Sequence, residues 1–302
     1  MKIIKTILIL LATSAMTIIG SGCAQKQTDQ KVIIKFENLN VLETTFNPDA
    51  GKHAYEYDLW SYEKNDIYEE KIKATVPKEF TVKFNGKKYT GTFNEVHRAI
   101  PGPFTCSYRG ENFSFEINAK TKELVAFTYQ ANTFDHGQTP DEAKCREIAD
   151  NFASKYIEIN QCSVETTIST ASNQYRFEYS RSISGIETKD YFYVRVDGNG
   201  NITDFYSRVM HGFDNVLAIE FDEKQILDAI ETKLVTIYEG VDNYESYTVR
   251  NFSIIQLEDG RFALMYNINA QFEKKHFDDG SYTIPQTPIR LLITGATLKP
   301  VK

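Results

Sequence analysis

The amino-acid sequence predicts an α+β fold, in which a β-rich N-terminal domain precedes two units that each pack one helix on an antiparallel sheet. Two amphipathic helices are the first observation: one covers residues 139–157, and the other begins at Asp222. Stretches of alternating apolar and polar residues around both helices are the second, because this alternation is typical of strands. A lone amphipathic helix cannot bury its apolar face, so each helix requires a sheet to pack on.

Composition indicates a folded chain whose partner is not a nucleic acid. The chain has 302 residues, of which 41% are hydrophobic, and its 18 Tyr and 20 Phe supply material for a core. This length is enough for two or three modules. The formal net charge is −7, and acidic and basic residues alternate along the chain rather than forming blocks. Nucleic-acid-binding proteins usually concentrate basic residues on one face, so no nucleic acid is expected.

The N-terminal segment predicts a secreted, lipid-anchored protein. Two lysines precede an apolar run over residues 7–19, which is typical of a signal peptide and too short for a comfortable membrane span. The Gly-Cys junction at Cys23 resembles a bacterial lipobox, although Gly20 occupies the place where Leu is usual. We therefore expect a signal peptide over residues 1–22 and acylation of Cys23 with palmitate-type chains that hold the protein on the extracytoplasmic face of the cell membrane. Ordinary secretion is the alternative.

Residues 23–31 are polar and are expected to form a tether, which leads into the β-rich domain over residues 32–110. In that domain, Asn85-Gly86 lies between alternating stretches and predicts a type I′ hairpin. A second hairpin is expected over residues 113–129, with its turn at residues 118–122. Aromatic residues crowd the stretch from His53 to Tyr68, which lies between predicted strands.

Start signals define both helices. Thr139 is the expected N-cap of the first helix, with Pro140 at its first position and Glu142 completing a capping box. Asp222 is the expected N-cap of the second helix, with Gln225 as its capping-box partner. The predicted apolar faces consist of Cys145, Ile148, Ala149, Phe152 and Tyr156 in the first helix, and of Ile226, Leu227, Ile230, Leu234, Ile237 and Tyr238 in the second.

A hairpin precedes each helix, and the two hairpins have similar sequences. Phe115, Ile117, Asn118, Leu124 and Phe127 align with Val194, Val196, Asp197, Ile202 and Phe205. The order of hairpin, helix and meander then returns, which predicts an internal repeat. The expected units cover residues 111–212 and 213–302.

The helix DEAKCREIADNF, together with the hairpin YVRVDGNGNI, resembles PepSY-type (YcdB-like) domains over residues 111–293. These are small extracytoplasmic α+β modules with a cystatin-like helix on an antiparallel sheet. They often occur in tandem in secreted or lipid-anchored proteins of Gram-positive bacteria. The hairpin INAKTKEL departs from the pattern, because Lys122 stands where a glycine is usual. The resemblance implies binding or restraint of peptidases, and it brings no catalytic residue.

No catalytic, metal or cofactor site is predicted. His53, His97, His136, His211 and His276 are scattered, without a metal-ligand spacing. The stretch from Asp197 to Asn201 resembles the start of a calcium loop, but Ile202 and Arg208 replace the required Gly and Glu, so a hairpin turn is expected. Cys106 follows His97 after a Pro-Gly-Pro loop, and a packed thiol is favoured over a cysteine nucleophile.

The remaining cysteines are expected to be free. If Cys23 is acylated, Cys106, Cys145 and Cys162 remain, and an odd number cannot pair completely. Cys145 and Cys162 bracket most of the first helix, which would separate them by about 25 Å. Buried, unpaired thiols are therefore the preferred interpretation.

Tyrosines supply the last candidate surface. Either they pack inside the protein or they form a sheet face that binds a peptide or a glycan. Packing is the preferred interpretation for any single one, because only half the residues of a strand face outward and tyrosine is frequent in strands. The residues concerned are Tyr55, Tyr57, Tyr62, Tyr175, Tyr179, Tyr191 and Tyr193.

We therefore expect a non-enzymatic lipoprotein that binds or regulates a protein or peptide of the cell envelope. Exposed strand edges or a tyrosine-bearing sheet face would recruit that partner. An extracytoplasmic hydrolase, built from residues that converge only in three dimensions, is the alternative, and a receptor for a small ligand or glycan is another. A deep pocket with clustered His, Asp or Glu would favour the enzyme, and a shallow aromatic groove would favour binding.

Overall fold

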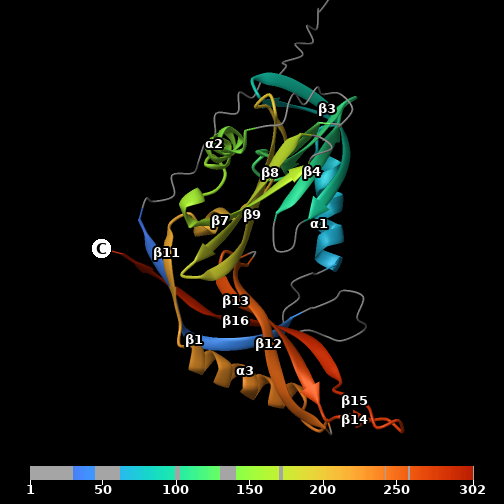
Figure 1. Ribbon diagram of the computed structural model, residues 1–302, viewed down its shortest axis with the longest axis vertical. Helices are drawn as coiled ribbons and strands as arrows, with labels where there is room; N and C mark the ends of the chain where they lie inside the picture. The colour runs from blue at the N-terminus through green and yellow to red at the C-terminus, as the bar shows by residue number, and fades with distance from the viewer. Residues whose placement is uncertain are drawn as a thin grey trace, which may run out of the picture.

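One large mixed sheet organises the protein (Figure 1). The computed structural model describes residues 30–44, 62–98, 103–129, 141–169, 173–241, 243–257 and 259–301. Fourteen strands of these residues join in a single sheet, and three α-helices accompany it. The predicted α+β class of separate helix-on-sheet units is therefore wrong, and the described chain is mostly β. Strands that were expected to lie in separate domains instead pair with one another: β4 (Phe104–Arg109) with β5 (Phe113–Asn118), and β9 (Ile186–Asp197) with β12 (Tyr244–Gln256).

The sheet has two parts, which meet at the long strand β9. In the lower part of Figure 1 the strand order is β11 (Val216–Glu220), β1 (Val32–Thr44), β16 (Gln286–Pro300), β13 (Phe262–Phe272) and β12 (Tyr244–Gln256). In the upper part it is β9 (Ile186–Asp197), β10 (Ile202–Arg208), β6 (Leu124–Tyr129), β5 (Phe113–Asn118), β4 (Phe104–Arg109), β3 (Lys87–Arg98) and β2 (Glu79–Phe84). Strands β7 (Cys162–Ser169) and β8 (Gln174–Ile183) branch from β9, so that β8 pairs with both β7 and β9.

Strand β1 lies between two strands that are distant from it in sequence. It pairs in parallel with β11 and antiparallel with β16. The first described strand is therefore part of the C-terminal sheet, whereas β2 to β5 lie in the upper part. The predicted division at residues 110 and 212 remains a prediction.

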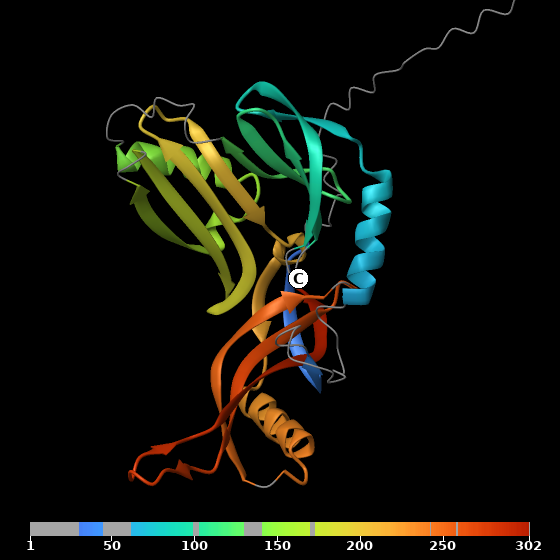
Figure 2. The same cartoon turned by 90° about the vertical axis from the view of Figure 1, so that its right-hand side faces the viewer.

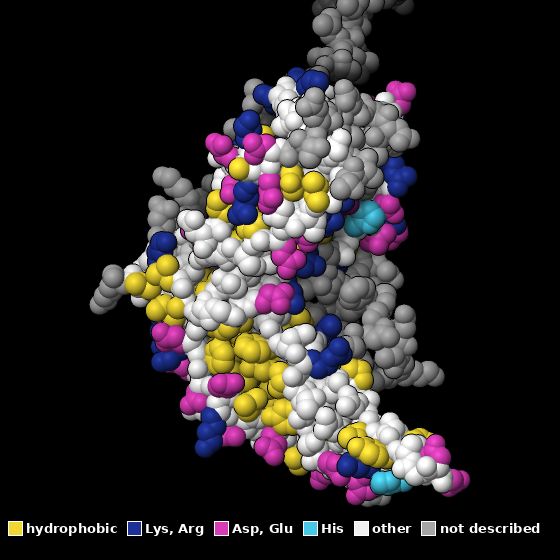
Figure 3. Space-filling model, viewed as in Figure 1, with side chains coloured by type: hydrophobic (Ala, Val, Ile, Leu, Met, Phe, Trp, Pro, Cys, Tyr) yellow, Lys and Arg dark blue, Asp and Glu magenta, His cyan; other side chains and the backbone are white. Residues whose placement is uncertain are grey.

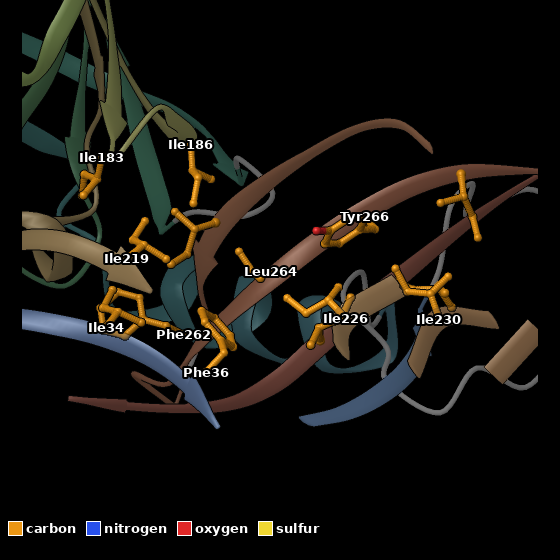
Figure 4. Close-up of a cluster of buried hydrophobic side chains, with 14 of the residues drawn as sticks. Ile34, Phe36, Ile183, Ile186, Ile219, Ile226, Ile230, Phe262, Leu264 and Tyr266 are labelled. Carbon is orange, nitrogen blue, oxygen red and sulfur yellow. The ribbon is translucent and has the colours of Figure 1, made fainter. Parts of the chain in front are cut away.

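Each part of the sheet has its own hydrophobic core. The upper core contains Phe127, Phe192 and Phe205, and α2 (Glu142–Ala153) contributes Cys145 and Ala149 to it. The lower core is shown in Figure 4, where Ile226 and Ile230 of α3 (Glu223–Ile237) face Tyr266 and Leu264 of β13. The tip of the β8–β9 hairpin reaches the lower core through Ile183 and Ile186, so this hairpin takes part in both cores.

The helices confirm part of the capping analysis and correct the rest. Asp222 caps α3, and its side chain accepts a hydrogen bond from the Gln225 backbone N–H, as predicted. The N-cap of α2 is Asp141 instead of Thr139, since the Asp141 carboxylate accepts a hydrogen bond from the Lys144 N–H. Thr139 and Pro140 lie outside the described residues.

One helix was not predicted. Helix α1 (Tyr62–Thr75) includes the end of the aromatic stretch, and it lies beside β3 (Figure 2). Ile67 and Tyr68 on this helix are about half exposed, so it lacks the strong apolar face that marks the other two helices. Two 3-10 turns, η2 (Ile159–Gln161) and η3 (His211–Phe213), complete the described helical structure.

The predicted hairpin turns are confirmed where the structure describes them. Asn85 and Gly86 both have positive φ, as a type I′ turn requires, and they join β2 to β3 with Phe84 opposite Lys87. In the β5–β6 turn, Lys122 has a φ of 63°, and Gly200 in the β9–β10 turn has a φ of 80°. Lys122 thus adopts the left-handed conformation that a glycine adopts in the related hairpin.

Two further features concern the outside of the molecule. Strands β14 (Lys275–His276) and β15 (Tyr282–Thr283) form a small hairpin that projects beyond β13 and β16 (Figure 2). Acidic and basic side chains are interspersed over the visible surface, and hydrophobic side chains gather in the lower half, where β12 and α3 lie (Figure 3). Among the residues that the structure describes, no α-helix combines the length and the apolar character needed to cross a bilayer.

Candidate functional site

A polar face of the upper sheet brings together tyrosines, arginines and carboxylates. Strand alternation turns Phe177 and Tyr179 of β8, and Phe192 and Val194 of β9, into the core. The residues between them lie on the opposite face of the sheet. We call this opposite face the tyrosine–arginine face, and it consists of Arg176, Glu178, Tyr191, Tyr193, Arg195, Asp204 and Tyr206.

Arg176 is held from several sides. Its Nη2 donates a hydrogen bond to the Tyr191 hydroxyl at 2.9 Å, and this hydroxyl donates to Glu178 Oε2 at 2.7 Å. Its guanidinium also lies 4.1 Å from the centroid of the Tyr193 ring. A guanidinium at this distance is attracted to the ring face. These contacts fix the position of Arg176, but they do not occupy all five of its N–H donors.

Arg195 also lies near the Tyr193 ring, and it contacts Asp204. Its Nη1 is 3.1 Å from Asp204 Oδ2, while Asp204 Oδ1 accepts a hydrogen bond from Thr128 Oγ1 at 2.8 Å. The Tyr193 hydroxyl also donates to Asp204 Oδ1, at 3.3 Å. Burial raises the pKa of Asp204 above its ordinary value, and these donors act against that rise.

The strand register places these groups in one row. Thr167 of β7 lies opposite Arg176 of β8, Arg176 lies opposite Arg195 of β9, and Arg195 lies opposite Asp204 of β10. Like charges directly opposite each other on neighbouring strands are destabilising. The pair of Arg176 and Arg195 is therefore costly in itself. The carboxylates of Glu178 and Asp204 offset part of this repulsion, because each lies next to one of the two arginines.

A hollow lies at the end of this row. Its volume is about 260 Å³, and both charged residues in its wall are arginines. Residues of the β7 end supply hydroxyl groups and one apolar side chain. The lining residues are Thr167, Ile168, Ser169, Gln174, Arg176 and Arg195.

Strand β7 beside the hollow is an edge strand. Within the described residues it pairs with β8 alone, in a regular register with no bulge. Its sequence, CSVETTIS, contains neither Lys nor Pro. Natural edge strands usually carry such residues or a bulge, which discourage pairing with another chain. Apart from the single charge of Glu165, strand β7 has none of these protections.

The other described edges are protected. Strand β2 is short and has Pro77 before it and Lys83 within it. Strand β12 has two bulges and meets β9 only at Ile254. In β11, the Ile219 N–H donates to the Ser184 hydroxyl, so the edge is already occupied there. Of the described edges, β7 is therefore the most open to the addition of a strand.

Residues 107–208 match the family model of the YcdB, YcdC repeated domain. The match begins in β4 and ends with β10, so the matched region includes the tyrosine–arginine face, the hollow and β7. It confirms the YcdB-like part of the predicted resemblance, over residues 107–208 instead of 111–293. This family is related to PepSY but is not the same, so the PepSY part of the prediction is corrected. No curated protein matches the chain.

Within the repeated domain, only some of the predicted tyrosines reach the candidate site. Tyr191 and Tyr193 lie on the tyrosine–arginine face, whereas Tyr179 is fully buried and Tyr175 packs against the upper core. Tyr55 and Tyr57 lie outside the described residues. Tyr62 begins α1, in a stretch whose side chains the structure does not describe.

Sequence reasoning missed Arg176 and Arg195. Both alternate with tyrosines along their strands, which was the available signal. The pairing of Arg176 with Arg195, however, depends on a bulge between β8 and β9.

That bulge is stabilised by a buried ion-pair network. Ser182 pairs with Glu187 but Ser180 pairs with Tyr191, so three residues of β9 face one residue of β8. Thr188 Oγ1 bridges the bulge, because it donates to the Arg181 carbonyl and accepts from the Asp190 N–H. The fully buried Arg181 contacts the carboxylates of Asp190 and Asp214, both at 3.0 Å.

The network extends to a histidine. His211 Nδ1 lies 2.9 Å from Asp214 Oδ2, and this hydrogen bond raises the pKa of His211. The Asp190 carboxylate accepts a hydrogen bond from the Met210 N–H at 2.6 Å. Burial nevertheless raises the pKa of Asp190 to about 6. The network connects η3 to the β8–β9 hairpin. It also fixes the register in which residues 174–180 of β8 pair with residues 191–197 of β9.

The described histidines do not gather into one site. His97 contacts Glu95, His211 contacts Asp214, and His276 lies on β14. His53 and His136 lie outside the described residues, as does Cys23. In the described part of the chain, no three His, Cys, Asp or Glu side chains are arranged to hold a metal ion.

The predicted cysteine and turn residues have structural roles. Cys106, Cys145 and Cys162 are free, and burial raises the pKa of each thiol. Cys106 is buried in the upper core opposite Val96, while the neighbouring His97 is nearly half exposed, so the two side chains face opposite sides of the sheet. The Asp197 carboxylate accepts the N–H groups of Asn199 and Asn201, as in a hairpin turn.

Proposed function

We propose that the protein is a binding module of the cell envelope that holds an extended peptide segment as an added strand on β7. The open, regular edge of β7 is the observation that supports this function. Its backbone N–H and C=O groups on that edge supply the hydrogen bonds that a bound strand needs. Eight residues of strand span about 26 Å, which is long enough to hold a short peptide segment.

Side chains of β7 permit this approach. The last five residues of the strand, 165–169, are all exposed, and Glu165 is the single charged side chain of β7. Thr166, Thr167 and Ile168 are β-branched residues, which favour the extended conformation. An incoming strand therefore meets a rigid template and loses little free energy in ordering it.

The proposal includes acylation of Cys23 and a location on the outer face of the membrane. The apolar run and the Gly-Cys junction of residues 1–23 support both. Labelling cells with a palmitate analogue tests the anchor. Wild-type protein should take up the label and sediment with membranes, and the Cys23→Ala variant should do neither. Label in both proteins, or in neither, would overturn this part of the proposal.

Amide hydrogen exchange tests strand addition directly. The mature chain carrying Cys23→Ala is screened against an array of defined extended peptides, and the best binder is added to isotope-labelled protein. Because N–H directions alternate along a strand, every second amide of residues 163–169 should become protected, and the amides already bonded to β8 should change little. An array without a binder, or a bound peptide that leaves β7 exchange unchanged, would overturn the function.

Proline substitution gives a second test on the same strand. Of the neighbours Glu165 and Thr166, one has its N–H on the open edge and the other is bonded to β8. Glu165→Pro and Thr166→Pro should therefore differ: one unfolds at a lower temperature, and the other keeps its stability and loses the peptide. Full binding by the stably folded variant would contradict strand addition.

A further inference from the structure

We infer that the arginine-lined hollow at the end of β7 binds a side-chain carboxylate of the added peptide strand, so that the protein selects acidic segments. This inference rests on the proposed function, because the strand addition brings the carboxylate to the hollow. The ligand class is an extended peptide with Glu or Asp at one defined position.

The row of paired residues defines that position. Thr167, Arg176 and Arg195 are directly opposite one another on β7, β8 and β9, so their side chains lie on one face. A strand added to β7 would place its own residue in this row, about 4.8 Å beyond Thr167. Thr167 is short, and a glutamate side chain there can extend over it toward the Arg176 guanidinium.

Charge favours a carboxylate as the occupant. The hollow contains two guanidinium groups and no carboxylate in its lining. The opposed pair of Arg176 and Arg195 is unfavourable, and an anion between or beside them would relieve the repulsion. Each guanidinium has five N–H donors in a fork that fits a carboxylate. Glu178 and Asp204 occupy only part of these donors.

The site is ordered before the ligand arrives. Arg176 packs at 4.1 Å from the Tyr193 ring and Arg195 at 5.9 Å from the same ring. The Tyr191 hydroxyl and Asp204 restrain the two guanidinium groups further. Binding therefore costs less side-chain entropy than it would for two free arginines. Tyr193 has a positioning role, since both guanidinium groups lie near its ring.

Matched peptides test the selectivity. The best peptide of the array is made with an amidated C-terminus and with Glu, Gln or a phosphoserine at the position opposite Thr167; another has no acidic side chain and a free C-terminal carboxylate. The Glu peptide should bind wild-type protein about tenfold more tightly than the Gln peptide, as expected for a charge-assisted hydrogen bond. Equal binding of the Glu and Gln peptides would overturn the inference. Tighter binding of the phosphoserine or C-terminal carboxylate peptide would overturn its assignment to a side-chain carboxylate.

Arginine variants locate the effect. Arg176→Gln should reduce the ratio between Glu and Gln peptides to near one, and Arg176→Lys should keep part of it, because a lysine retains the charge without the fork. Arg250→Gln is the matched control, since Arg250 is exposed on β12 and does not line the hollow. An unchanged ratio in Arg176→Gln would contradict the inference. The peptide comparison on wild-type protein does not depend on the stability of any variant.

The experiments distinguish a failure of acidic selection from a failure of strand addition. If every second amide of β7 is protected by Glu and Gln peptides alike and their affinities are equal, strand addition stands and acidic selection is wrong. If a Glu peptide binds without protecting β7, the hollow acts apart from strand addition, and the proposed function is wrong together with the inference that rests on it.

Discussion

Phe127 of β6 and Phe205 of β10 lie directly opposite each other, and each has the same place in its own hairpin. Phe127 pairs with Phe115 within the β5–β6 hairpin, as Phe205 pairs with Val194 within the β9–β10 hairpin. The two aligned hairpins are thus related by an approximate two-fold axis between these phenylalanines. Phe84 stacks on both rings, at 4.2 Å and 5.6 Å between centroids.

Removing either ring should destabilise the upper core. Phe127→Ala and Phe205→Ala should each lower the free energy of unfolding by about 3–5 kcal/mol, because both side chains are fully buried and leave a cavity. Urea unfolding followed by tryptophan fluorescence or circular dichroism measures the change. Leu217→Ala, on an exposed part of β11, is the control and should change stability by less than about 1 kcal/mol. A loss for one phenylalanine only would argue against equivalent roles.

The two hairpin turns should respond in opposite directions to exchange of their residues. Gly200→Ala should destabilise by about 1 kcal/mol, because φ is positive there and the new Cβ would lie 3.2 Å from Ile148 Cδ1. Lys122→Gly should stabilise by up to about 1 kcal/mol, since it relieves a left-handed lysine. Differential scanning calorimetry of both variants checks the signs. Destabilisation by Lys122→Gly would show that the contact of Lys122 Nζ with the Ala119 carbonyl outweighs the strain.

The ion-pair network should make stability fall as pH rises from about 4 to 7. Burial raises the pKa of Asp190 to about 6, above the unfolded value of about 3.9, so the folded state binds more protons in this window. His211 has a raised pKa as well, and its contribution is complete below about 6.5 and lost as pH rises through the folded value. The lowered pKa of Asp214 acts only at lower pH, where its protonation removes stability.

Urea midpoints at pH 4.5, 5.5, 6.5 and 7.5 test this dependence. Asp190→Asn should flatten the slope below pH 6 and leave the His211 part in place. Glu187→Gln, on the exposed part of β9, is the control and should reproduce the wild-type slope. Stability that rises with pH over this range in the wild-type protein would contradict the assigned pKa directions.

The two helix caps should be worth similar amounts. Asp141→Ala and Asp222→Ala each remove a carboxylate that accepts a backbone N–H of the first helical turn, and each should cost about 1 kcal/mol. Asp→Asn at either position keeps the acceptor and should cost less. Thermal unfolding of the four variants provides the comparison. A full loss for Asn as well would mean that the charge, and not the hydrogen bond, stabilises the helix end.

Sequence reasoning succeeded where the determinants are local. The turn at Asn85-Gly86 needs two residues with positive φ, and the cap of α3 needs Asp222 three residues before an N–H. It failed for α1, whose apolar face is weak, and at Thr139, because Asp141 two residues later satisfies the same requirement. The joined sheet could not be foreseen, since the pairing of β6 with β10 depends on contacts between segments about eighty residues apart.

The candidate site likewise depends on contacts between distant segments, which the sequence does not reveal. Its tyrosines were visible in the sequence, but the Ser184-Gly185 turn alone would place Arg176 opposite Tyr193. The bulge at Arg181 shifts the register by two residues and places Arg176 opposite Arg195. This bulge depends on the buried contacts of Arg181 with Asp190 and Asp214, which come from three separate segments.

The position of β1 also constrains the order in which the chain folds. Val32 pairs with Pro300, so the first described strand finds its antiparallel partner only when the last strand is present. Closing a loop of this length is slow compared with forming the local hairpins of the upper sheet. A chain that emerges N-terminus first must therefore keep β1 unpaired on its β16 side until β16 has been synthesised. We expect chaperones to contact this apolar strand while the chain folds, and we expect loss of β16 to leave the lower sheet unable to form.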